Sequence, residues 1–488
     1  MRDLLMGIDV GTTAMKAAVF DVSKPQQPLS VGRAHSDTTQ PRPGWSERDP
    51  DDVLVGLRKC IGDAIKNISA VSIRAIGISG TACGAWLVAN KRPVRPAIMW
   101  NDGRATPIVS EWHRNGTMSE VFERSGNIPF PGYTLPVLRW LLENERESLE
   151  RSDIMLFCKD WIRGWLTDVW GSDETDASYA PFGIRERQWD DHLLDITGTS
   201  GVKHLLPELQ DPHRVDSLRS DVASELGLSP GIPVALGATD IIAGCVGGGA
   251  VDPGHAVSIL GTSANSSVVT ETPEFEPREI GIMAAAPLNR WVRTMLNTSG
   301  SMTLDWAAQQ LSGGDVSRMF DLAADANLSD LPILLPYLAG AGVVSPFVDA
   351  KARGAYLGLR VDHGPKELAR AAVEGLAFAV ADSYDSMPTN VVEITAIGGA
   401  ARSDLLLQTI SDACEATVIR PRGEEFGARG VALLAAHSAG LITSSELSDA
   451  VGELDVDRRF EPAPERVAER LKRYRACSRA TRELGRLW

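Results

Sequence analysis

The sequence predicts an α/β protein with a duplicated architecture, in which two domains lie around a central cleft. The first observation is a glycine–threonine turn that occurs twice, at Gly11-Thr12-Thr13 and at Gly261-Thr262, each time between two apolar runs. The second is that strand-like runs alternate with helical patterns, which is typical of α/β units. The third is the length of 488 residues, which is sufficient for two domains with full cores.

The first turn carries side chains that suit a phosphate group. Gly11 lets the backbone approach a ligand closely, and the hydroxyls and amides of Thr12 and Thr13 suit phosphate oxygens. Asp9 lies on the strand just before the turn, and Lys16 follows it. A carboxylate beside a phosphate loop makes sense where a cation lies between them. A capped turn with a surface lysine explains the same residues without a ligand, and this segment alone does not separate the two interpretations.

The other elements follow from the spacing of apolar residues and from glycine and proline positions. In chain order, the pattern predicts strands at 4–10 and 14–21, a helix at 52–68, a strand at 72–79, helices at 135–150 and 155–168, a strand at 233–237, a helix at 366–387, a strand at 392–397, and helices at 403–415 and from about 428. Pro253-Gly254 marks a natural boundary. We expect a first domain at 1–248, a second at 249–455 and a basic helical tail at 456–488.

Composition and charge exclude several classes of protein. The formal charge of −15 argues against nucleic acid or an anionic membrane surface as the main partner. The six cysteines are scattered without a Cys-x-x-Cys pair, which disfavours structural zinc and suits a reduced, cytoplasmic compartment. The sequence has no signal-peptide pattern and no clean apolar stretch of membrane-spanning length. We expect a cytoplasmic protein with a small-molecule ligand, and only the general frequency of homodimers favours that assembly.

The common nucleotide-binding motifs are missing from the sequence. It contains no Gly-x4-Gly-Lys-Ser/Thr loop, no Gly-x-Gly-x-x-Gly that opens a helix and no His-Arg-Asp loop. P-loop, Rossmann and protein-kinase readings are therefore disfavoured. A nucleotide would have to be bound by other means.

Taken together, the motifs resemble the FGGY family of carbohydrate kinases over about residues 4–440. This family has a duplicated actin-like (ribonuclease H-like) ATPase fold with two domains around a central cleft. The matching segments are residues 7–13, 43–50 (Pro-Gly-Trp-Ser-Glu-Arg-Asp-Pro), 99–104 (Met-Trp-Asn-Asp-Gly-Arg), 237–240 (Gly-Ala-Thr-Asp), 260–263, 352–359, 398–403 and 425–430. Their joint order and spacing make a chance match improbable.

The resemblance implies that the cleft binds ATP and Mg²⁺. Asp240 would accept the proton of the attacking hydroxyl, and Asp9 and Asp240 would hold the metal. Taken alone, Asp240 is better explained as a helix N-cap, and it is the family motif that favours the base. The residues implied to contact ATP are Gly11, Thr12, Thr13, Lys16, Gly261, Thr262, Gly300, Gly398, Gly399, Ala400 and Ser403.

The resemblance also implies a sugar site. The implied contacts are Thr81, Cys83, Trp100, Asn101, Asp102, Arg104 and Asp240. Asp102 and Arg104 would meet sugar hydroxyls, with Trp100 as an apolar platform. A solvated loop is the alternative explanation for the two charged residues.

Departures from the family motifs leave the substrate open. Thr81-Ala82-Cys83 stands where xylulose kinases have Gln-Met-His and glycerol kinases have Gln-Arg-Glu, so this wall is smaller and uncharged. Residues 158–161 and 173–178 look closer to erythritol and L-xylulose kinases, whereas residues 100–104 are of the xylulose type. The resemblance implies an ATP-dependent kinase for a terminal hydroxyl of a small ketose or polyol, with a pentulose such as xylulose preferred. Erythritol, L-xylulose or a keto-sugar acid are alternative substrates, and a nucleotide-binding sensor without turnover is the alternative from another class.

Overall fold

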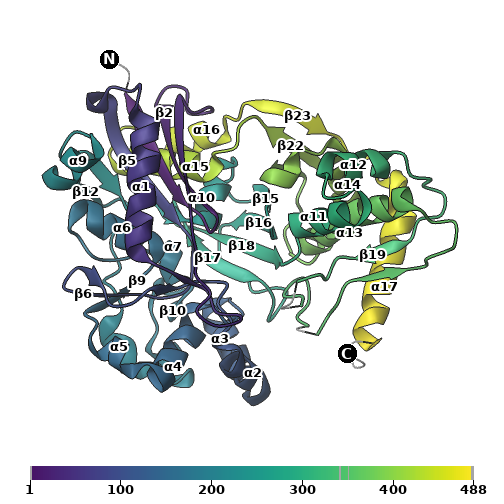
Figure 1. The fold of residues 1–488 in the computed structure, drawn as a ribbon, viewed down its shortest axis with the longest axis horizontal. Helices are drawn as coiled ribbons and strands as arrows, with labels where there is room; N and C mark the ends of the chain where they lie inside the picture. The colour runs from purple at the N-terminus through teal and green to yellow at the C-terminus, as the bar shows by residue number, and fades with distance from the viewer. Residues whose placement is uncertain (1–2, 340–341, 350, 485–488) are drawn as a thin grey trace.

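The computed structural model describes residues 3–339, 342–349 and 351–484, and it has two lobes, each built on a mixed seven-stranded sheet (Figure 1). The first sheet has the strand order β12-β13-β5-β1-β2-β3, and β14 also pairs with β5. Its strands are β1 (Leu4–Val10), β2 (Ala14–Asp21), β3 (Ser30–His35), β5 (Ile73–Gly80), β12 (Val215–Ser217), β13 (Pro233–Ala235) and β14 (Ala238–Thr239). The central strand β1 is almost entirely buried, because helices cover both faces of the sheet.

The second sheet repeats the connectivity of the first. Its order is β17-β18-β16-β15-β21-β22-β23. The strands are β15 (Ala256–Leu260), β16 (Ala264–Thr270), β17 (Ile282–Ala286), β18 (Arg290–Asn297), β21 (Glu393–Ile397), β22 (Thr417–Pro421) and β23 (Val456–Phe460). In both lobes a tight antiparallel hairpin (β1–β2, β15–β16) carries the Gly-Thr turn, and a parallel strand (β5, β21) lies beside its first strand. The predicted duplication is confirmed.

Helices and short strands complete each lobe. In the first lobe these are β4 (Glu47–Arg48), α1 (Pro50–Ile65), β6 (Trp86–Ala89), β7 (Arg92–Pro93), β8 (Ala97–Ile98), α2 (Thr106–Asn115), α3 (Thr117–Ser125), α4 (Thr134–Asn144), α5 (Arg146–Glu150), β9 (Ile154–Leu156), α6 (Cys158–Thr167), α7 (Glu174–Ala177), β10 (Phe182–Gly183), β11 (Gln188–Trp189), α8 (Asp191–Ile196) and α9 (Ser220–Leu226). In the second they are α11 (Ser301–Leu311), α12 (Val316–Ala324), β19 (Ile333–Leu335), β20 (Ala355–Leu357), α13 (Pro365–Asp385), the 3₁₀ helix η3 (Gly399–Arg402), α14 (Asp404–Cys414) and α17 (Ala468–Leu484).

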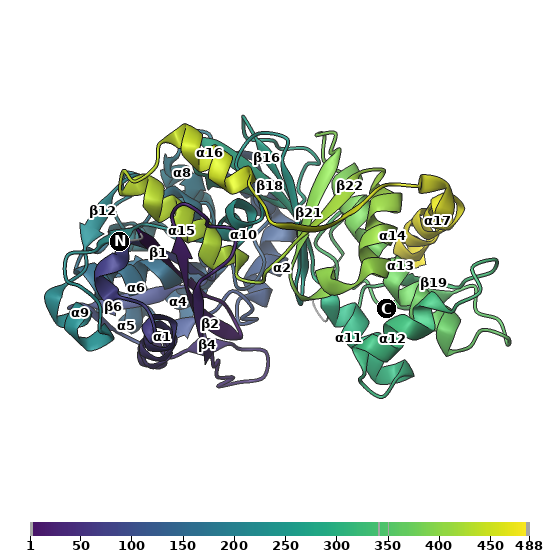
Figure 2. The same cartoon turned by 90° about the horizontal axis from the view of Figure 1, so that it is seen from above.

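Two helices, α10 (Asp240–Gly247) and α15 (Phe426–Ser438), pack against each other between the lobes. Although α15 comes late in the chain, it lies on β1 and β5 of the first sheet, and α16 (Ser444–Gly452) follows it there (Figure 2). Glycines allow this close approach. A Cβ at Gly7 would overlap the carbonyl oxygen of Ala428, and a Cβ at Gly77 would overlap that of Val431. After the strands of the second sheet up to β22, the chain therefore returns to the first lobe, where α15 packs on β1 and β5.

Three predicted elements differ from the structure. The predicted helix at 135–150 is two helices, because Glu145 has a non-helical backbone (φ −140°, ψ 45°) between α4 and α5. The predicted helix at 155–168 begins as strand β9, because Ile154–Leu156 pairs with β6 before α6 starts. The predicted helical tail begins with β23, which forms the edge of the second sheet before α17, and residues 485–488 of that tail lie outside the described residues.

The structure also describes the cysteines and the helix lengths, from which the sequence analysis argued against structural zinc and a membrane-spanning segment. All six cysteines are free thiols, four of them buried, and none is in a disulfide. Within the described parts of the chain, no helix is both long and apolar enough to cross a bilayer.

Candidate active site

The first Gly-Thr turn is held from behind by a buried arginine. It closes the β1–β2 hairpin, where the amide of Gly11 donates to the carbonyl of Ala14 (3.0 Å). Nη2 of Arg48 donates to the carbonyl oxygens of Gly11 (3.1 Å) and Thr12 (2.8 Å). Arg48 is 1% exposed. Its charge offsets the two carbonyl oxygens that would otherwise repel a phosphate, so the turn is suited to an anion.

The second Gly-Thr turn lies against the start of α11. Gly300 precedes this helix, and a Cβ there would lie 2.6 Å from the carbonyl oxygen of Gly261 and closer still to Ser263. The amide of Ser301 donates to the carbonyl of Gly261 (2.7 Å). Thr262 is exposed at the tip of the turn. The positive end of the α11 dipole is therefore placed beside Gly261 and Thr262, as a phosphate site requires.

Two adjoining cavities contain most of the other predicted ATP contacts. The first, about 290 Å³, is lined by Lys16 of the first lobe and by Gly398 and Gly399 of the second. The other, about 730 Å³, is lined by Ala400 and Ser403 together with residues of α11 and α12. Gly399 lines both. Their combined volume is sufficient for a nucleotide; the larger cavity is lined by the second lobe alone, and Lys16 of the first lobe borders the smaller one.

The ammonium group of Lys16 already forms an ion pair within the protein. It is the cross-strand partner of Asp9, and its Nζ lies 3.1 Å from Oε2 of Glu425. Glu425 also pairs with Arg33. Lys16 thus borders the nucleotide cavity while its charge is shared with a carboxylate from the other half of the sequence.

Asp240 begins α10 and lies at the carboxyl edge of the first sheet. β14 pairs in parallel with β5, with Thr239 opposite Gly80, so Asp240 and Thr81 leave the sheet side by side. The carboxylate accepts hydrogen bonds from the backbone amides of Ile241 (2.9 Å) and Ala82. Burial, and then the nearby charge of Asp9, raise the pKa of Asp240 to about 7. This is the range in which a carboxylate works best as a general base near neutral pH.

Asp9 is the second carboxylate of this edge, and together the pair fits a divalent cation. Burial is the largest cause that raises the pKa of Asp9, and the charge of Glu425 adds to it, while Lys16 opposes them. A Cβ at Gly427 would lie 2.7 Å from Oδ2 of Asp9, so only glycine leaves space beside this oxygen. Two buried carboxylates, of which Asp9 raises the proton affinity of Asp240, are the donor set expected of a Mg²⁺ site whose ion supplies the missing charge.

We expect Asp240→Asn to stabilise the metal-free protein, and to do so more at pH 8 than at pH 5.5. The folded-state pKa of about 7 lies above the usual aspartate value of 3.8, so ionising this buried group costs stability progressively as the pH rises through the folded pKa. The amide does not ionise. The gain should be about 2 kcal/mol larger at pH 8 than at pH 5.5. Urea unfolding in EDTA measures it, with the exposed Asp449→Asn as control. An equal gain at both pH values would contradict the prediction.

The loop after β8 joins the expected sugar site to the first phosphate turn. Trp100 is half-buried, and its Nε1 donates to Oγ1 of Thr12 (3.0 Å). Asn101 is exposed. Trp100 thus lies next to the phosphate turn, and its role as an apolar platform for the sugar stays a prediction.

Asp102 is already satisfied by protein groups, and Arg104 is bonded to protein groups through its Nε and Nη2 atoms. Asp102 accepts four hydrogen bonds: Oδ2 accepts from the Ser46 amide (2.6 Å) and Arg104 Nη2 (2.9 Å), and Oδ1 accepts from the Arg104 amide and Nε (2.8 Å each). Arg104 also donates to Glu47 (2.7 Å) and stacks on Trp45 (3.9 Å). Both side chains are fully buried. A carboxylate with four donors has no acceptor site left for a sugar, so the geometry favours positioning of the Trp100 loop as the role of Asp102. The buried Nη1 of Arg104 has no hydrogen-bond partner among the described residues, and its contact with the sugar stays a prediction.

Replacing Arg104 with methionine should destabilise the fold strongly. The substitution leaves the buried carboxylates of Asp102 and Glu47 without their shared partner. Breaking a buried pair in this way costs about 3–5 kcal/mol. Arg42→Met is the matched control, because Arg42 stacks on the same Trp45 ring (4.7 Å) but is exposed, and it should cost less than about 1 kcal/mol. Urea unfolding compares the two, and similar losses would show that the network carries little energy.

Cys83 and the short helix α7 lie beside Asp240. Cys83 is 4% exposed in a left-handed conformation (φ 66°), and burial raises its thiol pKa well above the usual value, so it is a neutral wall. The amide of Thr239, which precedes Asp240, donates to Oγ1 of Thr175 in α7 (3.2 Å). Thr81 is 2% exposed, and its amide donates to Val10 at the end of β1 (3.2 Å). The predicted sugar-site residues Thr81, Cys83 and Asp240 are therefore brought together.

Three buried aspartates anchor α7 around one lysine. Asp160, Asp173 and Asp176 lie close enough to share a cation, but the ammonium of Lys159 already lies among them. Asp160 is 2.6 Å and Asp176 is 3.1 Å from Nζ. The lysine supplies the charge that a metal would otherwise supply, so this cluster is a structural anchor.

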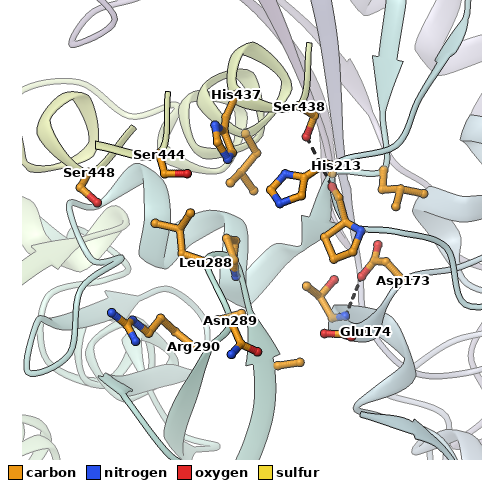
Figure 3. Close-up of a pocket in the computed structure, with 18 of the residues that line it drawn as sticks. Asp173, Glu174, His213, Leu288, Asn289, Arg290, His437, Ser438, Ser444 and Ser448 are labelled. Carbon is orange, nitrogen blue, oxygen red and sulfur yellow. Dashed lines mark hydrogen bonds between the residues drawn. The ribbon is translucent and has the colours of Figure 1, made fainter. Parts of the chain in front are cut away.

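A further cavity, about 610 Å³, lies at the far end of α15 (Figure 3). Arg290, His437 and Gly237 are among its lining residues. α15 begins beside Asp9, where Gly427 contacts the carboxylate, and His437 is about 15 Å further along the helix axis. This cavity is therefore separate from the phosphate turns.

Sequence reasoning did not assign several residues that shape the site. Arg48, Thr175 and Glu425 contact predicted site residues from distant parts of the chain. Arg48 lies in the segment 43–50, which was noted only as a family motif. That motif was the signal that the sequence offered. The hydrogen bond between Arg48 and Thr12, 36 residues apart, could not be predicted from the spacing.

Two family models cover most of the chain. Residues 4–247 match the N-terminal domain of the FGGY family of carbohydrate kinases, and residues 256–439 match its C-terminal domain. The break between the matched segments follows α10, close to the predicted boundary at 248.

Relatives of known name resemble the chain over nearly its full length. The xylulose kinase of Escherichia coli (strain K12) is 31% identical over 482 residues, which is 95% of this chain and 96% of that protein. The erythritol kinase of Brucella abortus (strain 2308) is 30% identical over 472 residues, 90% of this chain and 88% of that protein. The crystal structure of a xyloylose kinase from Brucella ovis has a TM-score of 0.89 at 30% identity and covers 99% of this chain and 100% of that one.

These findings confirm the resemblance drawn from the motifs and the duplicated actin-like fold that it implied. They also fix the class of reaction, phosphoryl transfer to an alcohol group of a carbohydrate. The chain belongs to the FGGY family of carbohydrate kinases.

Proposed function

We propose that this protein transfers the γ-phosphate of ATP to a terminal hydroxyl of a small ketose or polyol, and that a pentulose such as xylulose is its acceptor. The observation that carries the proposal is Asp240, a buried carboxylate with a pKa of about 7, at the sheet edge next to the first phosphate turn. The similarity to the E. coli xylulose kinase supports the pentulose. The Trp100 loop, which is of the xylulose type, supports it as well.

Phosphoryl transfer depends mainly on positioning and on charge stabilisation. In the proposed reaction, Asp240 accepts the proton of the acceptor hydroxyl as its oxygen attacks the γ-phosphorus. The amides of Ile241 and Ala82 hold the carboxylate in place. The turns at Gly11 and Gly261 hold the phosphates in line, with Lys16 and the α11 N-terminus nearby. Mg²⁺ bound by Asp9 and Asp240 would neutralise charge on the β- and γ-phosphates.

The two-lobe arrangement suits exclusion of water, which competes with the sugar as phosphoryl acceptor. The nucleotide cavity is lined from both lobes, by Lys16 on one side and Gly398 on the other. α10 and α15 are the packed elements between the lobes. Closure around them on binding of the acceptor would assemble the site and remove water together.

An erythritol-type polyol kinase is the second candidate. Two observations favour it: the small, uncharged wall Thr81-Ala82-Cys83, and the similarity to the Brucella erythritol kinase over 90% of this chain. A polyol lacks the ketose carbonyl, so a pocket without a charged side chain at this wall accepts it as readily.

Mg²⁺-dependent ADP formation across a panel of C3–C6 ketoses, polyols and keto-sugar acids tests the proposal, with a no-acceptor blank. We expect the rate of ADP formation with D-xylulose to exceed the rate of the no-acceptor blank by at least about 100-fold. A stronger signal with erythritol or L-xylulose would move the assignment to that acceptor. A response equal to the blank for every compound, together with a thermal shift by ATP, would overturn the kinase in favour of a sensor.

A further inference from the structure

The hydroxyl of Tyr179 is a buried polar group that the fold leaves without a partner. Tyr179 is 1% exposed, and its Oη has no hydrogen-bond partner among the described residues. A buried hydroxyl left unpaired costs about 1–3 kcal/mol, and in native proteins such groups are rare. We propose that Tyr179 is a substrate-binding residue, whose hydroxyl hydrogen-bonds an oxygen of the ketose or polyol acceptor away from the phosphorylated end. This inference rests on the proposed kinase function.

The fold places Tyr179 beside the catalytic edge of the sheet. Asp240 accepts a hydrogen bond from the amide of Ala82, and Cys83 follows directly. Tyr179, Ala82 and Cys83 belong to one buried cluster that also contains Ala238, two residues before Asp240. In the proposal, an acceptor whose terminal hydroxyl meets Asp240 extends along the Cys83 wall toward Tyr179, which lies close enough to Asp240 for the carboxylate charge to act on the phenol.

The backbone on either side of Tyr179 is held rigidly. One helical turn earlier, Oγ1 of Thr175 accepts from the amide of Thr239 (3.2 Å). The carbonyl of Ser178 accepts from the hydroxyl of Tyr133 (3.0 Å) and from Nδ2 of Asn127 (2.8 Å). The phenol is thus presented by a fixed frame, which is the condition for selective recognition of a substrate hydroxyl.

The protonation state makes the phenol a donor. Burial is the main cause that raises the pKa of Tyr179 well above its usual value, and the charge of Asp240 acts in the same direction. The hydroxyl therefore keeps its proton across the working pH range. It can donate to a carbonyl or hydroxyl oxygen of the acceptor and can accept from a hydroxyl in return.

Tyr133 provides a matched control of the same chemistry. Its ring centroid is 6.4 Å from that of Tyr179, and it is equally buried. Its hydroxyl, however, is already bonded to Ser178. Removing the Tyr133 hydroxyl should therefore lower stability, whereas removing the Tyr179 hydroxyl should leave the stability of the unliganded protein unchanged or raise it.

The test compares Tyr179→Phe and Tyr133→Phe by urea unfolding without ligand and by acceptor kinetics. For Tyr179→Phe we expect stability at or above that of the wild type and a fall of about 10- to 100-fold in kcat/KM for the best acceptor. Among deoxy analogues of that acceptor, one should be used equally well by the wild type and by Tyr179→Phe, because it lacks the oxygen that the phenol binds.

Two results would overturn the proposal. One is a Tyr179→Phe variant less stable than the wild type without ligand, which would show that the hydroxyl serves the fold. The other is kcat/KM within twofold of the wild type for every acceptor. A wild-type protein that phosphorylates nothing would instead refute the proposed function, and the unfolding comparison would still decide whether the hydroxyl is free.

Discussion

Asp240→Asn should lower kcat by about 10²- to 10⁴-fold and leave the KM values for ATP and acceptor within about threefold of the wild type. Asparagine is isosteric with aspartate, so its side-chain oxygen can still accept the hydrogen bonds from the amides of Ile241 and Ala82. Its amide oxygen, however, is not basic enough to take the acceptor proton. The loss should therefore fall on the chemical step.

Steady-state kinetics with the best acceptor measures this effect, and single-turnover quench-flow separates chemistry from product release. Asp449→Asn is the control, since it removes the same charge from an exposed position on α16 that does not line the nucleotide cavities. If Asp240→Asn kept kcat within fivefold of the wild type, Asp240 would not be the base. Asp240 would then have only the structural role at the helix N-terminus that the sequence analysis gave as the alternative.

The second large effect is expected from Gly77→Ala. A Cβ at Gly77 would overlap the carbonyl of Val431, so α15 would have to move off β5. The same helix carries Gly427, which lies against Asp9, and a shift would disturb the proposed metal site as well. We expect a loss of more than about 3 kcal/mol in unfolding free energy, because the clash is with backbone and not with a flexible side chain.

Gly62→Ala is the matched control for this substitution. Gly62 lies in α1, and a Cβ there would meet nothing within 4 Å. Alanine should stabilise this helix by about 0.5–1 kcal/mol. Urea unfolding and ADP formation compare the two variants. A Gly77→Ala protein of near wild-type stability would mean that α15 can shift along the sheet without loss of packing.

The sequence determined those features that depend on local order. Repeated Gly-Thr turns between apolar strands identified the duplicated sheets, because a strand–turn–strand pattern needs only neighbouring residues. The start of α10 at Asp240 and the glycine turn at Gly398 could be located for the same reason. The motif order was sufficient to identify the family.

Only the tertiary structure decided which charged groups are free. The family motif implied sugar contacts for Asp102 and Arg104, yet Asp102 also accepts from Ser46 and Arg104 donates to Glu47, both more than 50 residues away. Short apolar runs were ambiguous in the same way: Ile154–Leu156 became a strand because β6 offered it backbone partners.

The electrostatics of the site could not be predicted from the sequence either. The pKa of Asp240 depends on burial and on Asp9, which is 231 positions earlier in the sequence. The unpaired hydroxyl of Tyr179 is recognised only once its whole surroundings are known. Sequence thus determined the residue types and the local turns, whereas desolvation and hydrogen-bond satisfaction, which sum over contacts distant in the chain, were decided by the folded structure.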